Sequence, residues 1–449
     1  MHPAPVSGSV RVPLTGCDAF FLALEDLMRS GGQGRNVGLT VLELGEGFDA
    51  CALAGAARRF SLTHPLSQAK LERAWLFGVP RWRTPRILRP DAVSVTEHPS
   101  GTSVTALCRN LLAGNGERCF ELHHVRGERG TTVVARWSHL LFDGRGAELA
   151  FQELAGWAQT PPCGEAVPVA SWGEPFTPPA GIAARWRATR AFVRRHYELK
   201  PPDFQSLGGP RPQPGRSEFR VMGFSLGETR QIQQRASRLT GGIFQMPYFF
   251  AAVARAHAAV FRLRGVEPVS YVSPVPIQSR STKDRHPIFQ NQVTVLHFKL
   301  PAPVVRGFEE AVAAVHSQFA AAVREGVETS AAMVLWWMRR MPPALYRRFL
   351  QRDTGGQMVS FFQSHTGEFL AGLRDFCGAR IENGWHIPAV SQPPGSGIFF
   401  SEREGRLSAT ISWHEGVMTR QEVDQMEQSL RADLLGVEGP PSSRPAGLA

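Results

Sequence analysis

The feature that most constrains the fold is a histidine placed where a strand ends. Residues 139–144 read His-Leu-Leu-Phe-Asp-Gly, an HxxxDG sequence, directly after the apolar stretch Thr131–Trp137. Alternating apolar residues predict a strand over that stretch, and helical periodicity predicts a helix at Gly146–Ala158. The sequence therefore predicts a mixed α/β architecture with His139 on a strand-loop-helix connection.

The residue types in this loop favour proton transfer. An imidazole has an unperturbed pKa near neutrality, so His139 is suited to act as a general base that takes a proton from an attacking alcohol or amine. Asp143 lies beside Gly144, which permits a sharp turn, and we expect the carboxylate to hold the loop through a salt bridge to an arginine. The alternative for His139 is a strand-end histidine bonded to backbone, since HxxxDG alone often arises by chance.

The chain length and the order of the predicted elements indicate two lobes with a similar mix of helices and strands. The 449 residues are 43% hydrophobic and 20% charged, which is typical of a globular chain with a large core. We predict a first lobe over 1–175, a basic, Pro-rich crossover over 176–216, a second lobe over 217–436 and a disordered tail over 437–449. The predicted elements are strands at Val37–Leu44, Thr102–Cys108, Arg118–Val125, Val269–Val275 and Gln292–Leu300, a hairpin at Gly397–Arg403 and Arg406–Trp413, and helices at Cys17–Arg29, Phe48–Phe60, Gly227–Leu239, Met246–Arg264, Phe308–Glu325 and Ala331–Arg352, with a last helix opened by a capping box at Thr419 and Glu422.

The net charge indicates which classes of partner the protein favours. A formal charge of +11 favours partners that carry phosphate or carboxylate, such as coenzyme A, an acidic carrier protein or anionic lipid headgroups. No DNA- or RNA-binding signature is present, so we predict no nucleic-acid partner. The six cysteines form no CxxC pair, which predicts neither a metal site nor disulfides and favours a reducing cytoplasm.

One segment is ambiguous between packing and surface binding. Residues 332–352 mix bulky apolar side chains with arginines at helical spacing, and Pro342 and Pro343 interrupt them. The segment is expected either to rest on a membrane or oily substrate as a peripheral contact or to pack with an arginine-rich outer face.

Several segments together resemble a known superfamily. The HxxxDG loop resembles the active-site motif of the chloramphenicol acetyltransferase and condensation-domain superfamily of CoA-dependent acyltransferases. Further segments resemble its bacterial wax ester synthase and diacylglycerol acyltransferase branch, namely Cys17–Leu22 through Glu25, His64-Pro65-Leu66, Val275–Arg280 and Gln290-Asn291-Gln292. The resemblance implies two chloramphenicol-acetyltransferase-like lobes that form a V-shaped pseudo-dimer with a tunnel between them.

The resemblance also implies roles for individual residues. His139 would be the catalytic base, and Asp143, Gly144 and Arg280 would support the site, with Arg280 as the partner of Asp143. The remaining candidates line the expected tunnel: Ser138, which stands where many relatives have a second histidine, Asn291, and Ser364 and His365 in a stretch that resembles the family's SNxxG region only loosely. No metal and no permanently bound cofactor is implied.

The function that follows is transfer of an acyl group from a thioester to an alcohol or amine, without an acyl-enzyme. The co-substrate would be acyl-CoA or a phosphopantetheinyl acyl carrier, and a monomer is expected. Two alternatives stay open: a free-standing condensation domain that acts on carrier-bound substrates, and a non-catalytic module that docks a carrier protein.

Overall fold

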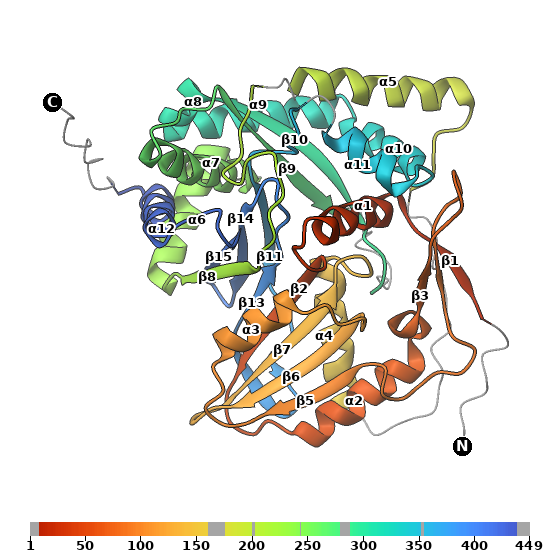
Figure 1. The fold of residues 1–449 in the computed structure, drawn as a ribbon. Helices are drawn as coiled ribbons and strands as arrows, with labels where there is room; N and C mark the ends of the chain where they lie inside the picture. Colours follow the sequence, from red (N-terminus) through yellow and green to blue (C-terminus); the bar gives the residue numbers. More distant parts are fainter. Residues whose placement is uncertain are drawn as a thin grey trace.

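The computed structural model describes residues 9–159, 176–199, 203–242, 244–278, 288–351 and 354–437. Two mixed lobes lie one above the other in Figure 1, and the long first sheet forms the lower one. The predicted tail lies outside the described residues apart from Val437, and Arg280 lies outside them as well.

The first lobe is built on a six-stranded sheet in the order β12-β13-β2-β7-β6-β5. Neighbouring strands are antiparallel except β5 and β6. Alternate residues of β2 and β7 enter different apolar clusters, one shared with α2 and α4 and the other shared with α3. The elements are α1 (Gly16–Ser30), β2 (Val37–Leu44), α2 (Ala50–Thr63), β5 (Ser94–His98), α3 (Val104–Ala113), β6 (Phe120–Arg126), β7 (Thr131–Ser138), α4 (Gly144–Gln159), β12 (Asp375–Phe376) and β13 (Ala379–Pro388).

In the second lobe α6, α8, α9 and α12 pack on α7, which is buried along almost its whole length. A four-stranded sheet in the order β11-β14-β15-β8 and a two-stranded ladder of β10 and β9 complete it. The elements are β8 (Ser217–Gly223), α6 (Leu226–Thr240), α7 (Met246–Leu263), β9 (Ser270–Gln278), β10 (Val293–Pro301), α8 (Ala302–Arg306), α9 (Phe308–Arg324), α10 (Val327–Met338), α11 (Pro343–Gln351), β11 (Phe362–Glu368), β14 (Ser396–Arg403), β15 (Arg406–His414) and α12 (Arg420–Leu435).

A smaller sheet stands at the outer edge of the first lobe. Its order is β1-β4-β3, and β1 and β3 carry labels at the right of Figure 1. The strands are β1 (Arg11–Pro13), β3 (Lys70–Glu72) and β4 (Arg81–Arg83), and the short 3-10 helix Pro65–Gln68 precedes β3.

The later part of the chain contributes two strands to the first sheet. β12 and β13 come from the range 217–436, yet β13 pairs antiparallel with β2 from Pro388 opposite Gly38 to Ile381 opposite Leu44. The late segment therefore completes the first sheet. In the range 176–216, α5 (Ile182–Leu199) is a long helix that packs on α10.

One predicted element was wrong. Thr102–Cys108 was expected to be a strand, but Val104–Ala113 is helix α3. The Ser103 side chain accepts a hydrogen bond from the Ala106 amide at 3.3 Å and so caps the helix, while Leu107, Cys108 and Leu112 are buried along one face. The local cap and the 3–4 spacing of apolar residues therefore prevailed over the apparent alternation.

Other predicted elements were confirmed. Strand β2 has the predicted bounds, the hairpin forms as β14 and β15, and Thr419 and Glu422 form the capping box of α12. The predicted helix at Ala331–Arg352 is divided into α10 and α11, and α10 packs against α1, α5 and β10. Much of this segment therefore packs against other elements of the same chain.

Candidate active site

His139 lies in the turn directly after β7. Its amide donates to the Asn36 carbonyl at 3.0 Å, and the Phe142 amide turns back to the Ser138 carbonyl at 3.1 Å. The imidazole is half-buried and stacks on the Phe21 ring of α1, with centroids 3.9 Å apart and planes 24° apart. The strand fixes the backbone and the aromatic ring fixes the side chain, so the imidazole has a defined position.

The surroundings of His139 favour its neutral form. Burial lowers its pKa from the ordinary 6.5, and contacts with its own backbone carbonyl and with the charge of Asp143 act in the opposite direction. The Nδ1 atom is buried and makes no hydrogen bond to the described part of the chain. At neutral pH a deprotonated ring is able to accept a proton.

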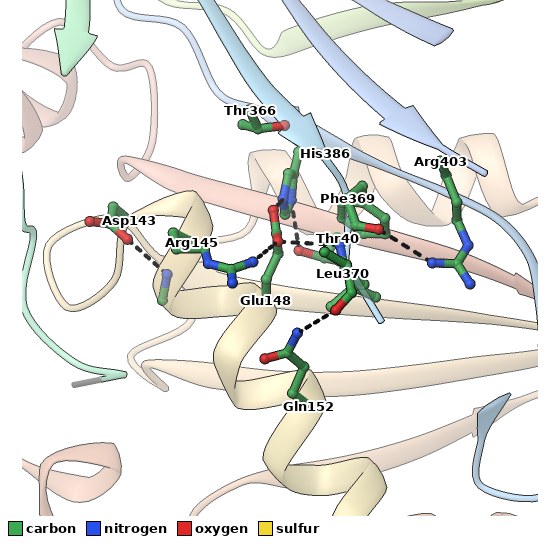
Figure 2. A network of polar contacts seen from close by, with 12 residues as sticks. Thr40, Asp143, Arg145, Glu148, Gln152, Thr366, Phe369, Leu370, His386 and Arg403 are labelled. Atoms are coloured by element: carbon green, nitrogen blue, oxygen red, sulfur yellow. Dashed lines mark hydrogen bonds and ion pairs between the residues drawn. The ribbon is translucent and has the colours of Figure 1, made fainter. Parts of the chain in front are cut away.

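Asp143 is buried and joins the loop to another part of the chain. Its Oδ1 accepts the Gly146 amide at 2.8 Å, within the first turn of α4, and Figure 2 draws this bond. Its Oδ2 accepts the Gln292 amide at 3.0 Å. Both oxygens thus accept hydrogen bonds from backbone N–H groups, and these bonds anchor the start of α4. Gly144 is the first residue of α4.

The segment 288–292 holds the loop that carries His139 through several hydrogen bonds. The Gln290 amide donates to the Leu141 carbonyl at 2.8 Å. The Asn291 side chain donates through Nδ2 to the His139 carbonyl and to Asp18 Oδ1, both at 2.9 Å. The Asn291 side chain therefore holds the backbone of His139, the expected base.

Asp18 is a part of the site that sequence reasoning missed. Its side chain in the first turn of α1 is fully buried, and it accepts Asn291 N at 2.9 Å and Thr15 N at 3.0 Å in addition to Asn291 Nδ2. Burial raises its pKa, and the bonds from Asn291 and Thr15 oppose that rise. The available signal was the capping-box spacing Thr15-x-x-Asp18, which indicates a helix start but not the tie to Asn291.

The other predicted site residues lie in different surroundings. Ser138 is buried, and its hydroxyl has no hydrogen-bond partner within the described ranges. Ser364 and His365 lie on β11, where the His365 ring stacks on Phe249 with centroids 4.4 Å apart and burial lowers its pKa to about 4. Across the residues that the structure describes, no hydrogen bond or ring contact joins Ser364 or His365 to His139.

A polar network lies behind the site and joins both halves of the chain (Figure 2). Trp137 Nε1 donates to Thr40 Oγ1 at 3.0 Å, and Thr40 Oγ1 lies 3.0 Å from His386 Nδ1. The Thr40 hydroxyl oxygen accepts the Trp137 indole N–H and is also hydrogen-bonded to His386 Nδ1. The other ring nitrogen, Nε2, lies 3.4 Å from the acceptor Glu148 Oε1.

The network holds the indole beside the imidazole. Glu148 Oε2 also accepts Arg145 at 2.7 Å and the Leu370 amide at 3.2 Å, so it ties α4 to the turn before β12. The Trp137 ring centroid is 5.3 Å from that of His139. A buried chain of donors and acceptors from β7, β2, β13 and α4 therefore stiffens the wall of the site.

The described ranges hold neither a cluster of metal ligands nor a helix that could span a membrane. They contain no group of three or more His, Cys, Asp or Glu side chains arranged to hold a metal ion. None of the helices in those ranges has the length and apolar character needed to cross a membrane.

Comparison with known proteins places this geometry in a known fold. No protein-family model and no curated protein matches the chain by sequence. Among solved structures, TRI3 trichothecene 15-O-acetyltransferase from Fusarium sporotrichioides matches with a TM-score of 0.71 and 13% identity, covering 96% of this chain and 97% of that one. The chain therefore shares the fold of this acetyltransferase. The two-lobed α/β architecture predicted from the sequence is thereby confirmed, and the superfamily stays a prediction.

Two further structures show how widely this fold is shared. The EpoB cyclization-docking bidomain from the nonribosomal peptide synthetase of Sorangium cellulosum matches with a TM-score of 0.65 and 14% identity, over 99% of this chain and 88% of that one. The wax ester synthase/diacylglycerol acyltransferase from Marinobacter aquaeolei VT8 matches with a TM-score of 0.59 and 15% identity, over 94% and 98%. These values do not single out the wax ester synthase branch, which stays a prediction.

Proposed function

We propose that this protein is an acyltransferase that moves an acyl group from a thioester donor to an alcohol or amine, with His139 as general base. The observation that carries the proposal is the half-buried His139 imidazole at the end of β7, stacked on Phe21 and held through its backbone by Asn36 and Asn291. The lowered pKa keeps this base neutral at the pH where it would act.

The chemistry requires one proton acceptor and no covalent enzyme intermediate. Because Nδ1 of His139 is buried, Nε2 is the ring atom that would take the proton from the acceptor hydroxyl or amine. The acceptor's lone pair forms a bond to the thioester carbonyl carbon, and the tetrahedral intermediate collapses with cleavage of the carbon–sulfur bond. The imidazolium then returns its proton to the departing thiolate, which restores the neutral base.

The donor is proposed as acyl-CoA or an acyl group on a phosphopantetheinyl carrier, reaching His139 through a tunnel between the lobes. The formal charge of +11 favours either donor, since both bring negative charge. Asp143 and Gly144 support the loop in this proposal, and Arg280 keeps its predicted role beside Asp143.

The test compares wild type with His139→Ala, using acyl-CoA and carrier-loaded donors with a panel of alcohols and amines. The expected loss is ~10²-fold or more in kcat/KM. His316→Ala is the matched control, because His316 lies exposed on α9 and should leave the rate unchanged. Equal product from wild type and His139→Ala, with both proteins folded by circular dichroism, would exclude the proposed mechanism.

A second candidate is a free-standing condensation domain. The likeness to the EpoB bidomain, with a TM-score of 0.65, favours keeping it. Turnover with carrier-loaded thioesters but not with free acyl-CoA would select this function. A non-catalytic docking module predicts instead tight carrier binding that His139→Ala leaves unchanged, and no turnover with any donor.

A further inference from the structure

The loop between β3 and β4 exposes three consecutive large apolar side chains. Trp75 is 86% exposed, Leu76 60% and Phe77 68%, and we call these residues the Trp75–Phe77 tip. Single apolar residues on a surface are ordinary, but three adjacent ones at this exposure form a contiguous patch that favours removal from water. Ile87, 82% exposed, adds a fourth apolar side chain in the segment after β4.

The tip is carried by an ordered base. β3 pairs with β4 with Leu71 opposite Trp82, and the Trp82 side chain is only 3% exposed in the core of the first lobe. At the first residue of the loop, Arg73 forms a two-pronged ion pair with Asp26 of α1, at 2.8 and 2.5 Å. The β-ladder and this ion pair fix where the tip projects, so its exposure is a feature of the fold.

Cationic residues outnumber acidic ones in the chain segment that contains the tip. Between Lys70 and Asp91 the chain carries six cationic side chains, Lys70, Arg73, Arg81, Arg83, Arg86 and Arg89, against the two acids Glu72 and Asp91. Arg81 and Arg86 are exposed and have no ion-pair partner among the described residues. At the base of the hairpin a surface groove of about 230 Å³ is lined by Arg11, Arg73, Arg81 and Glu72.

We propose that the β3–β4 hairpin docks this protein on an anionic lipid bilayer. The Trp75–Phe77 tip enters the interface between headgroups and acyl chains, where tryptophan is favoured, and the exposed side chains of Arg81 and Arg86 contact lipid phosphates. The apolar tip suits the acyl-chain region of the bilayer, and the cationic side chains near it suit the anionic headgroups. A protein partner would instead have to offer an apolar pocket with an acidic rim.

The experiment is co-sedimentation of the full chain with phosphatidylcholine vesicles, with and without phosphatidylserine. We expect binding to the phosphatidylserine vesicles that weakens as salt is raised. Trp75→Ser combined with Phe77→Ser should weaken this binding by ~10-fold or more, because both side chains lose apolar burial. Arg81→Gln combined with Arg86→Gln should remove most of the preference for phosphatidylserine.

Two control variants test whether vesicle binding depends on the hairpin itself. Trp186→Ser removes an exposed tryptophan, 63% exposed on α5, and should bind as wild type does. His139→Ala should also bind normally, so the result is independent of the catalytic proposal.

Three results would overturn the inference: no binding by wild type, unchanged binding by the Trp75, Phe77 double variant, or equal loss in Trp186→Ser. A wild-type dimer in light scattering that the double variant converts to a monomer would reassign the tip to a contact between copies.

Discussion

Replacing Asn291 with alanine is the sharpest test of how the site is held. Its Nδ2 bridges the His139 carbonyl and the buried Asp18 carboxylate, both at 2.9 Å, so the change removes two hydrogen bonds at once. A bond to a neutral carbonyl contributes ~0.5–1.5 kcal/mol and one to a charged group ~1.5–3 kcal/mol. The Asn291 amide still donates to Asp18, which moderates the cost. We expect the free energy of unfolding to fall by ~2–4 kcal/mol.

The same change should slow turnover, because the His139 backbone loses its lateral support. We expect kcat to fall by ~10–10²-fold, since small displacements of a catalytic group have effects of this size. Urea unfolding followed by tryptophan fluorescence gives the stability change, and steady-state rates with the active donor give the kinetic one. Asn110→Ala is the matched control, because Asn110 is exposed on α3.

Two results would contradict this role of Asn291. If Asn291→Ala unfolds within ~0.5 kcal/mol of wild type, as a surface change does, the bridge contributes nothing measurable. If stability falls but kcat does not, Asn291 is structural only. Combining it with Asp18→Asn should give less than the sum of the two losses, because the two residues share the removed bond.

Three further predictions follow from the same geometry. Because the folded pKa of His139 is lowered from 6.5, the base is neutral above that pH, so kcat/KM should be flat there and fall only at lower pH; an acidic limb centred at or above 6.5 would contradict this. Thr40→Val keeps the side-chain shape but leaves the buried Trp137 indole N–H unpaired, and should cost ~2–4 kcal/mol in urea unfolding, whereas Thr40→Ser should stay near wild type. Gly38→Ala places a methyl group against the Trp137 ring and should cost ~1–3 kcal/mol and alter the near-UV circular dichroism, while Gly55→Ala, with open space around it, should do neither.

Local patterning predicted the elements that carry the site. Strand β2 matches its predicted bounds, and the strand before His139 and the helix after Asp143 both form. These elements depend on the order of apolar residues and on local caps, which are properties of a short stretch of chain. Where the two local signals conflicted, at Thr102–Cys108, the helix cap decided and the strand prediction was wrong.

Pairings across the chain could not be predicted in this way. β13 pairs with β2 although more than three hundred residues separate them in sequence, and its alternation is compatible with either lobe. The same holds for the bonds from Asn291 to Asp18, which join residues 273 positions apart. The stack of His365 on Phe249 of α7 is likewise a contact between distant segments, and the tunnel position of His365 stays a prediction.

The sequence by itself determined that His139 follows a strand, that a helix follows Asp143 and Gly144, and that the chain is basic and two-lobed. Only the tertiary structure decided the surroundings of the key side chains. Phe21 and Asn291 contact His139, Thr40 accepts a hydrogen bond from Trp137, and Trp75 is exposed to solvent. The reason is physical, since helix and strand preferences act over a few residues, whereas burial, stacking and long-range hydrogen bonds depend on how distant segments pack.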